Sequence, residues 1–200
     1  MYSRIDIPDN ETISSFFPEK GDFSYIELSS REIEDSSFIE CRMPYGHLPS
    51  CILRRLEFRN TDLSNTGMDA SHQVDVLYDS CLLTGTSFLK STLKKVTFSG
   101  CRGLYTVFSN IKADEILFKD SVFEDSDFSH ITGKKIVFEN CNLKSCNFVG
   151  TELKSLKLED TVFDGIYISE DAREARGAVL SLDNALAVLS SLDIEVDMTL

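Results

Sequence analysis

The side chains in this sequence that are best suited to act as nucleophiles, bases or metal ligands are thiols and imidazoles. They belong to six cysteines and three histidines: Cys41, Cys51, Cys81, Cys101, Cys141, Cys146, His47, His72 and His130. A thiol beside an imidazole makes a nucleophile with its base, paired C-x2-C motifs hold zinc, and an even number of thiols can form disulfides. Every interval between two cysteines is a multiple of five, however, and no C-x2-C motif occurs. The spacing therefore predicts a structural column and no reactive site.

A five-residue period organises most of the chain. It runs in one phase over residues 21–170, and the central position of each pentad is a large apolar or aromatic residue in 26 of 30 pentads. The exceptions are Gln73, Gly103, Ala113 and Gly133. The position two residues earlier holds every cysteine and is small or aliphatic in 29 of 30 pentads. These two positions avoid water, and the thiols act there as small apolar groups.

A period of five fits neither an α-helix nor a β-strand. Two inward residues in every five require a turn in every pentad, and four pentads close a square coil of 20 residues. We therefore expect an all-β solenoid of about seven and a half coils, stacked at about 4.8 Å. Each coil is too small to have a core of its own and is stable only against its neighbours.

Stacking in register predicts which core residues touch. Central residues 38, 58, 78, 98, 118, 138 and 158 lie above one another, and all but Leu158 are aromatic. The preceding face is irregular and contains Gln73, Ala113 and Gly133. Because a buried glutamine needs hydrogen-bond partners, we expect a distortion or an exposed kink near residues 71–75. We interpret it as a tolerated defect and not as a ligand site.

The repeat resembles the pentapeptide-repeat family, whose units read small, polar, large apolar, polar, polar. Units of this kind occur at 61–65 (TDLSN), 126–130 (SDFSH), 141–145 (CNLKS) and 146–150 (CNFVG). The resemblance covers residues 21–170. It implies a right-handed quadrilateral β-helix.

The ends of the chain are expected to form caps, because a solenoid otherwise leaves strand edges free to pair. Residues 1–20 form the N-terminal cap, in which Ile13, Phe16 and Phe17 cover the first coil. Residues 171–200 form the C-terminal cap, with a short α-helix over 181–192 and Ser181 as its N-cap. Residues 193–197 alternate like a strand. The cap either packs on its own last coil or also joins an identical copy, through Leu182, Ala185, Leu186, Leu189, Leu192, Ile194 and Val196.

The ending of the chain carries a narrower resemblance. A helix followed by SSLDIEVD at 190–197 is similar to the C-terminal ends of the quinolone-resistance and albicidin-resistance proteins, which protect DNA gyrase. That resemblance implies a homodimer that imitates B-form DNA and binds DNA gyrase or topoisomerase IV. Several quinolone-resistance proteins carry loops that interrupt the ladder, whereas residues 21–170 contain no insertion that shifts the phase.

The charge balance limits the partners. A net charge of −13 argues against direct binding of nucleic acid, because phosphates require clustered Lys and Arg. It is compatible with a polyanion mimic or with ordinary solubility. The acidic positions that could meet a partner are Asp114, Glu115, Asp120, Glu124, Asp125, Asp127, Glu139, Glu159, Asp160 and Asp164.

The basic residues do not fit a uniformly negative mimic of DNA. Three pairs recur every 40 residues on one face and form a stripe with Lys154: Arg54 and Arg55, Lys94 and Lys95, Lys134 and Lys135. The simplest interpretation is that they form ion pairs with Glu34, Asp35, Asp114 and Glu115 on alternate coils.

Catalysis and membrane insertion find no support in the sequence. The three histidines fall at outward positions, without a nucleophile, a phosphate-binding loop or a metal motif beside them. No apolar run approaches the ~20 residues that span a membrane, and residues 1–6 lack the apolar core of a signal peptide. We therefore expect a cytoplasmic, non-enzymatic protein without a cofactor. The alternative to a gyrase-binding mimic is a general protein-interaction scaffold.

Overall fold

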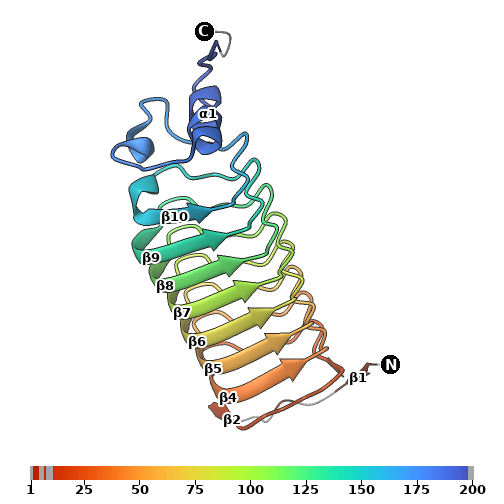
Figure 1. Cartoon of the computed structure of the whole chain (residues 1–200). Helices are drawn as coiled ribbons and strands as arrows, with labels where there is room; N and C mark the ends of the chain where they lie inside the picture. The colour runs from red at the N-terminus through yellow and green to blue at the C-terminus, as the bar shows by residue number, and fades with distance from the viewer. Residues whose placement is uncertain (1, 5–6, 8–10, 198–200) are drawn as a thin grey trace.

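The computed structural model describes residues 2–4, 7 and 11–197. It is a parallel β-solenoid whose strands stack along one axis from the N-terminal to the C-terminal end (Figure 1). One eight-stranded sheet contains β2 (Thr12–Ser14), β4 (Glu32–Ile39), β5 (Ile52–Arg59), β6 (His72–Asp79), β7 (Thr92–Ser99), β8 (Lys112–Lys119), β9 (Thr132–Glu139) and β10 (Leu156–Glu159). A two-stranded sheet joins β1 (Ser3–Arg4) to β3 (Gly21–Asp22).

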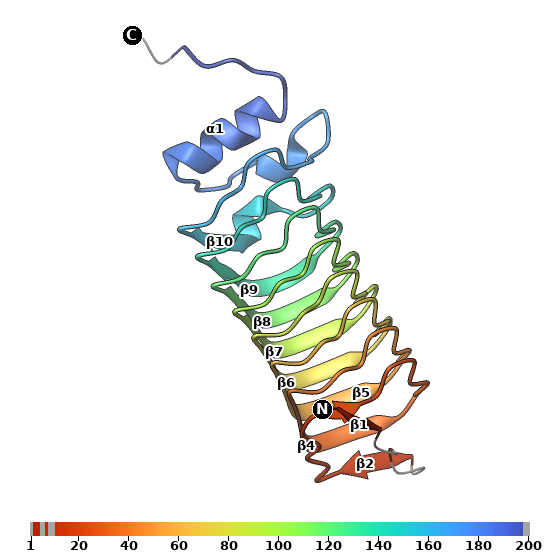
Figure 2. The same ribbon diagram turned by 90° about the vertical axis from the view of Figure 1, so that its right-hand side faces the viewer.

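The register of the strands confirms the 20-residue coil. Ile33 pairs with Leu53, Leu53 pairs with Gln73, and the shift stays at 20 residues through β10. The other faces are joined by isolated parallel bridges with the same shift, such as Arg42 with Asp62. Figure 2 shows the coils as a continuous stack with one short helix above the last of them. The expected four-sided β-helix with a short C-terminal helix is confirmed.

The chain turns each corner through a left-handed backbone conformation. Every fifth residue from Ser15 to Gly150 has a positive φ, and most of these residues are not glycine. The series is interrupted at position 155, where the 3-10 helix η1 (Leu153–Ser155) replaces a corner, and it resumes at Asp160 and Gly165. Because such residues are individually unfavourable away from glycine, the corners depend on the stacking of neighbouring coils.

Aromatic rings fill the core in two parallel rows. The first row is Phe38, Phe58, Tyr78, Phe98, Phe118 and Phe138, with successive centroids 4.6 to 5.1 Å apart. The second is Phe88, Phe108, Phe128 and Phe148, with centroids 5.0 to 5.4 Å apart. Rings within a row are stacked, whereas rings of different rows meet edge to face. The predicted aromatic column is thereby confirmed, and both contact geometries are favourable.

The small inward position carries a recurring hydrogen bond. A hydroxyl there donates to the backbone carbonyl 23 residues earlier, as Thr66 Oγ1 does to Met43 O at 2.6 Å and Thr86 Oγ1 to Leu63 O at 2.7 Å. Cys146 Sγ makes the same bond to Phe123 O at 2.8 Å. All six cysteines are buried and free, which confirms the predicted structural column. The bond from Cys146 shows that a thiol can also take the place of the hydroxyl.

Gln73 corrects one expectation. It is fully buried inside β6, which keeps its register with β5 and β7, so no distortion or exposed kink occurs at 71–75. Tyr78 Oη donates to Gln73 Oε1 at 2.9 Å, and Gln73 Nε2 donates to Ser71 Oγ at 3.0 Å. The expected kink was wrong because an aromatic row that contains one tyrosine supplies the missing hydroxyl inside the core.

Gly133 marks the other irregularity of that face. Its φ is +141°, and a Cβ atom there would lie 1.9 Å from the carbonyl oxygen of Ala113, its partner on β8. Only a residue without a Cβ atom fits this backbone conformation beside β8. Gly133 is exposed although it occupies a central position of the repeat.

At the N-terminal cap, Ile13 is buried and the ring of Phe16 packs edge-on against Phe23 and Phe38. Phe17 is 64% exposed, so its predicted covering role was wrong. Phe16 and Phe17 both lie beyond the end of β2, and Phe17 falls between the inward-facing Phe16 and the buried Pro18. Strand β2 already stacks on β4, with Ile13 opposite Ile33.

The C-terminal cap contains the 3-10 helix η2 (Arg173–Ala175) and the helix α1 (Leu182–Ser190). The predicted N-cap is confirmed, since Ser181 Oγ accepts a bond from the amide of Asn184 at 3.2 Å. The strand expected at 193–197 was wrong. These residues carry no strand assignment, and a strand requires a neighbouring strand to bond with.

Candidate partner-binding surface

One corner of the solenoid carries a ladder of alternating charge. Arg55 binds both Asp35 and Glu34 of the coil below it, with shortest nitrogen–oxygen distances of 2.5 and 2.9 Å. Lys95 lies 3.8 Å from Asp75 in the same way. The interpretation of the basic pairs as ion-pair partners is confirmed for this corner.

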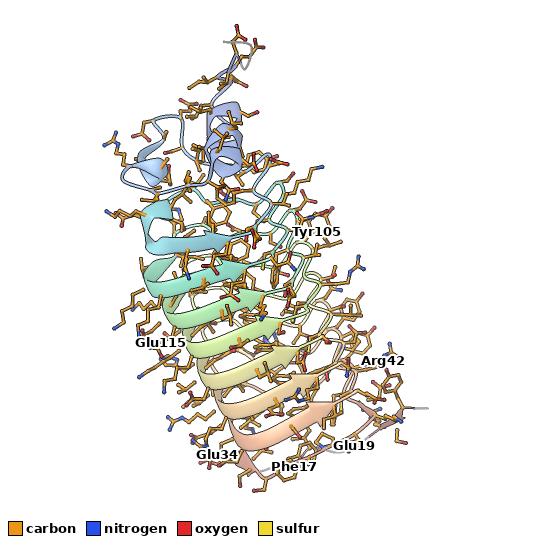
Figure 3. All side chains as sticks on the ribbon, in the orientation of Figure 1. Phe17, Glu19, Glu34, Arg42, Tyr105 and Glu115 are labelled. Atoms are coloured by element: carbon orange, nitrogen blue, oxygen red, sulfur yellow. The ribbon has the colours of Figure 1, made fainter. Side chains whose placement is uncertain are left out.

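The ladder continues upward through Lys134 with Asp114, at 3.7 Å, and Lys135 with Glu115. The hydrogen bond from Lys135 lowers the pKa of Glu115, and the bond from Arg55 lowers the pKa of Asp35. All these side chains are substantially exposed, so each pair contributes little stability. Their effect is to cancel charge, and Asp114 and Glu115 therefore add little to a negative surface. Figure 3 shows Glu34 and Glu115 along the same edge.

A second edge carries more acidic than basic residues, although Lys119 is the register partner of Glu139. Asp120, Asn140 and Asp160 follow the ends of β8, β9 and β10, and Asn140 Nδ2 donates to Asp120 Oδ1 at 2.8 Å. Glu139 and Glu159 are register partners one residue earlier, and Lys157 binds Glu159 at 2.6 Å. Like charges opposite each other destabilise a sheet, and Lys157 reduces this repulsion by its ion pair with Glu159. We call Asp120, Glu139, Glu159 and Asp160 the acidic edge.

The remaining predicted acidic residues lie on the turn-rich faces. Asp127 accepts bonds from the amide of Ser129 at 3.0 Å and from Asn147 Nδ2 at 3.1 Å. Glu124 accepts a bond from Asn142, and Asp125 occupies a left-handed corner. Asp164 lies farther along, in the last coil. The ten predicted positions are thus spread over several faces and do not form one cluster.

A groove separates α1 from the last coil and joins the acidic edge to the cap. Its volume is about 720 Å³, and Asp160, Asp164 and Asp183 contribute three carboxylates to its lining. Leu158, Val162 and Leu186 contribute apolar surface. Sequence reasoning did not include Asp183, because the five-residue period had ended and nothing in the sequence indicated how α1 would lie on the coil.

The helix above this groove keeps apolar surface exposed. Its buried side chains are Asn184, Ala187 and Val188, whereas Leu182 is 67% exposed. The other predicted interface positions on or just after the helix are half-buried: Ala185, Leu186, Leu189 and Leu192. Ile194 and Val196 in the following segment are exposed. The surface predicted for an identical copy therefore lies beside the acidic edge, at the end of the solenoid where α1 stands (Figure 2).

Chemistry at the titratable groups is disfavoured by their placement. His47, His72 and His130 are exposed, whereas the thiols are buried. Burial raises the pKa of Cys81, Cys101 and Cys146 to about 12. Among the described residues, no group of three or more His, Cys, Asp or Glu is placed to hold a metal ion. No helix in that part of the chain is long and apolar enough to cross a membrane.

Comparison with known proteins identifies the repeat. Residues 71–145 match the model of the pentapeptide repeat region, and the 20-residue coil continues on both sides of that range. Residues 71–145 are therefore a pentapeptide repeat region within the parallel β-solenoid. No catalytic family is indicated, and curated protein sequences give no match.

Solved structures of the same architecture resemble the chain at low identity. QnrB1, a plasmid-mediated fluoroquinolone resistance protein, is 14% identical, with a TM-score of 0.39 over 89% of this chain and 96% of that one. A pentapeptide repeat protein from the thylakoid lumen of Arabidopsis thaliana is 15% identical, with a TM-score of 0.41 over 68% of this chain and 83% of that one. Rfr23 from the cyanobacterium Cyanothece 51142 is 10% identical, with a TM-score of 0.33 over 80% and 91%. At these values no partner or activity transfers to this chain.

Proposed function

We propose that this protein is a non-catalytic DNA mimic that binds DNA gyrase or topoisomerase IV and protects it from a topoisomerase poison. The observation that carries the proposal is the acidic edge, which places carboxylates on successive coils of a rigid rod and continues into the groove beside α1. Such a surface is attracted to basic, DNA-binding surfaces by long-range steering. The protein acts by occupancy, in the cytoplasm, without binding nucleic acid or a membrane.

The proposed assembly is a homodimer through α1 and the residues that follow it. Leu182, Ile194 and Val196 are exposed apolar residues at one end of the solenoid, where a two-fold axis brings equivalent surfaces together. The acidic edges of two copies then meet near that axis and form a longer track. The track explains why an acidic surface and an apolar one lie side by side.

The alternative is a general protein-interaction scaffold with another cytoplasmic partner. It is favoured by Tyr25 and Tyr45, whose exposed rings stack 5.3 Å apart far from the acidic edge. Exposed aromatic residues are enriched in protein interfaces. A mimic of DNA has no need of them.

The deciding experiment is a gyrase assay with the purified full-length protein. Supercoiling and drug-induced cleavage are followed with a fluoroquinolone or albicidin present. We expect reduced cleavage and restored supercoiling near stoichiometric dose. The variant D120N/E139Q/D160N is expected to require about tenfold more protein, because electrostatic attraction depends on the charges removed. The control variant E11Q/E19Q/E27Q removes three exposed charges at the opposite end and is expected to keep full protection.

Two results contradict the proposal. If the wild type neither protects nor inhibits either topoisomerase at large excess, the protein does not act on these enzymes. If both triple variants protect as the wild type does, the acidic edge is not the binding surface. The scaffold alternative is then pursued by cross-linking through Tyr25 and Tyr45.

A further inference from the structure

The alternating charge ladder ends near a group of cations at the C-terminal cap. Acid and base alternate at the corner through Asp75, Lys95, Glu115 and Lys135. The next position in this series is Ser155, which bears no charge. Lys154 beside it lies in η1, which replaces the corner, so the alternation ends at this coil.

Lys154 lines a pocket between the last coils and the C-terminal cap. The pocket has a volume of about 510 Å³, and its cationic lining is Lys154, Arg173 and Arg176, with His130 beside them. Gly150 contributes the backbone of one wall. Its size lies within the range of small-molecule sites. Every lining residue except Gly150 has a polar side chain, and two of them are the carboxylates Glu152 and Glu174. The cations outnumber the carboxylates, which favours an anionic ligand.

A buried carboxylate fixes the geometry of this pocket. The side chain of Glu174 is 1% exposed. Its Oε1 accepts a bond from the Gly150 amide at 2.7 Å, and its Oε2 accepts one from Ser169 Oγ at 2.5 Å. Burial alone raises the pKa of Glu174, but these hydrogen bonds outweigh it and lower the pKa to about 2. These hydrogen bonds stabilise the charged carboxylate of Glu174 and hold η2 against the last complete coil.

The three cations of the pocket differ in the ion pairs that they form. Lys154 lies 3.3 Å from Glu152, and Arg173 lies 3.8 Å from Asp171 and 3.4 Å from Glu174. Arg176 makes no ion pair with any described residue. The hydrogen bond from Ser169 lowers the pKa of Asp171, and Asp171 is still near enough for the Arg176 charge to help lower that pKa. A guanidinium without an ion pair, held near an ammonium and an imidazole, can donate to an oxyanion, which Arg binds through two parallel hydrogen bonds.

We propose that the pocket binds a small oxyanion ligand, a phosphate ester or a polycarboxylate, with Arg176 and Lys154 as its principal contacts. Arg173 keeps its ion pair with Glu174 and forms one wall of the pocket. The Lys154–Glu152 pair is exposed and therefore weak, so a dianion can displace Glu152 at small cost. This inference does not depend on topoisomerase binding, because it concerns a different surface and a different class of ligand.

The test uses amide chemical shifts of the full-length, isotope-labelled protein. Inorganic pyrophosphate and citrate are titrated separately, with ionic strength held constant by potassium chloride. We expect saturable shifts centred on Gly150, Lys154 and Arg176. Saturation by pyrophosphate alone identifies a phosphate site, saturation by citrate alone identifies a carboxylate site, and saturation by both identifies a general oxyanion site. Each of these results supports the proposal.

Variants separate a pocket from general charge attraction. R176Q removes the guanidinium with its charge-assisted hydrogen bonds and is expected to weaken binding about tenfold or more. The control K144Q removes an exposed lysine outside the pocket and is expected to bind as the wild type. Spectra of the free variants show whether the fold is kept. Linear shifts with both anions, or equal affinity in R176Q and the wild type, overturn the proposal.

Discussion

Gln73 keeps its place in an apolar core because Tyr78, one pentad later in the same coil, brings a phenol hydroxyl to its amide. Ser71 Oγ accepts from the amide and donates to Ser91 Oγ at 3.1 Å, and Ser91 Oγ donates to Met68 O at 2.9 Å. Among the described residues, no buried side-chain nitrogen or oxygen lacks a hydrogen bond. The polar group is tolerated because its network is complete.

The completeness of this network predicts the cost of breaking it. Tyr78→Phe leaves Gln73 Oε1 buried without a donor, and we expect a loss of about 1–3 kcal/mol of unfolding free energy. Adding Gln73→Leu restores an apolar pair of the kind found in neighbouring coils, so the double variant is expected to be more stable than the sum of the single losses. Tyr105→Phe, at a 62% exposed residue, serves as the control and is expected to be neutral in urea denaturation. Equal stability of Tyr78→Phe and the wild type contradicts the prediction.

The thiols predict a pH limit of stability. Burial raises the pKa of Cys81, Cys101 and Cys146 from the ordinary 9.0 to about 12, and that of Cys141 to about 11. Unfolded thiols lose protons near pH 9, whereas folded ones keep them. The stabilisation is therefore fully present below about pH 9 and is lost as the pH rises toward 12.

The same burial makes the thiols unreactive. At pH 8 we expect Ellman's reagent to label none of the six thiols in the folded protein and all six in guanidinium chloride. Circular dichroism as a function of pH then locates the alkaline loss of structure. Rapid labelling of the folded protein, or constant stability between pH 9 and 12, contradicts the argument.

At the scale of a single coil, Gly133 is a position where a side chain has no room beside the neighbouring strand. A methyl group there meets the carbonyl of Ala113 at 1.9 Å in a backbone conformation that favours glycine. We expect Gly133→Ala to cost about 2 kcal/mol or more, measured by thermal and urea unfolding. Gly67→Ala places its methyl group 3.4 Å from His47 and is expected to be nearly neutral. A stable Gly133→Ala variant would show that β9 shifts freely on β8.

Elements built from the repeat were predictable, and elements outside it were less so. The phase of the cysteines was enough to predict the coil, the buried thiols and the stacked aromatic column, because each follows from which positions avoid water. The Gln73 network was not, since it depends on the direction of one phenol relative to one amide. The pocket around Arg176 and the groove at Asp183 also escaped prediction. They form where the period ends and tertiary packing places η2 and α1.

For the whole molecule, α1 leaves apolar surface exposed at the C-terminal end of the solenoid. A solenoid with an exposed apolar surface tends to associate, and we expect the wild type to have a dimeric mass by light scattering. Leu182→Glu changes a 67% exposed side chain and is expected to give a monomer of unchanged melting temperature. Near a two-fold axis, the introduced carboxylate faces the same carboxylate of the other copy, so the two negative charges repel each other.

The matched control places the same substitution away from the helix. Leu82 is 45% exposed on the middle coils, and Leu82→Glu is expected to leave the dimer intact. A monomeric wild type at all concentrations, or a dimeric Leu182→Glu variant, contradicts an interface at α1. The result also bears on the acidic edge. Only a dimer through this end joins two edges into one track, so a monomeric Leu182→Glu variant that still protects gyrase would show that a single edge is sufficient.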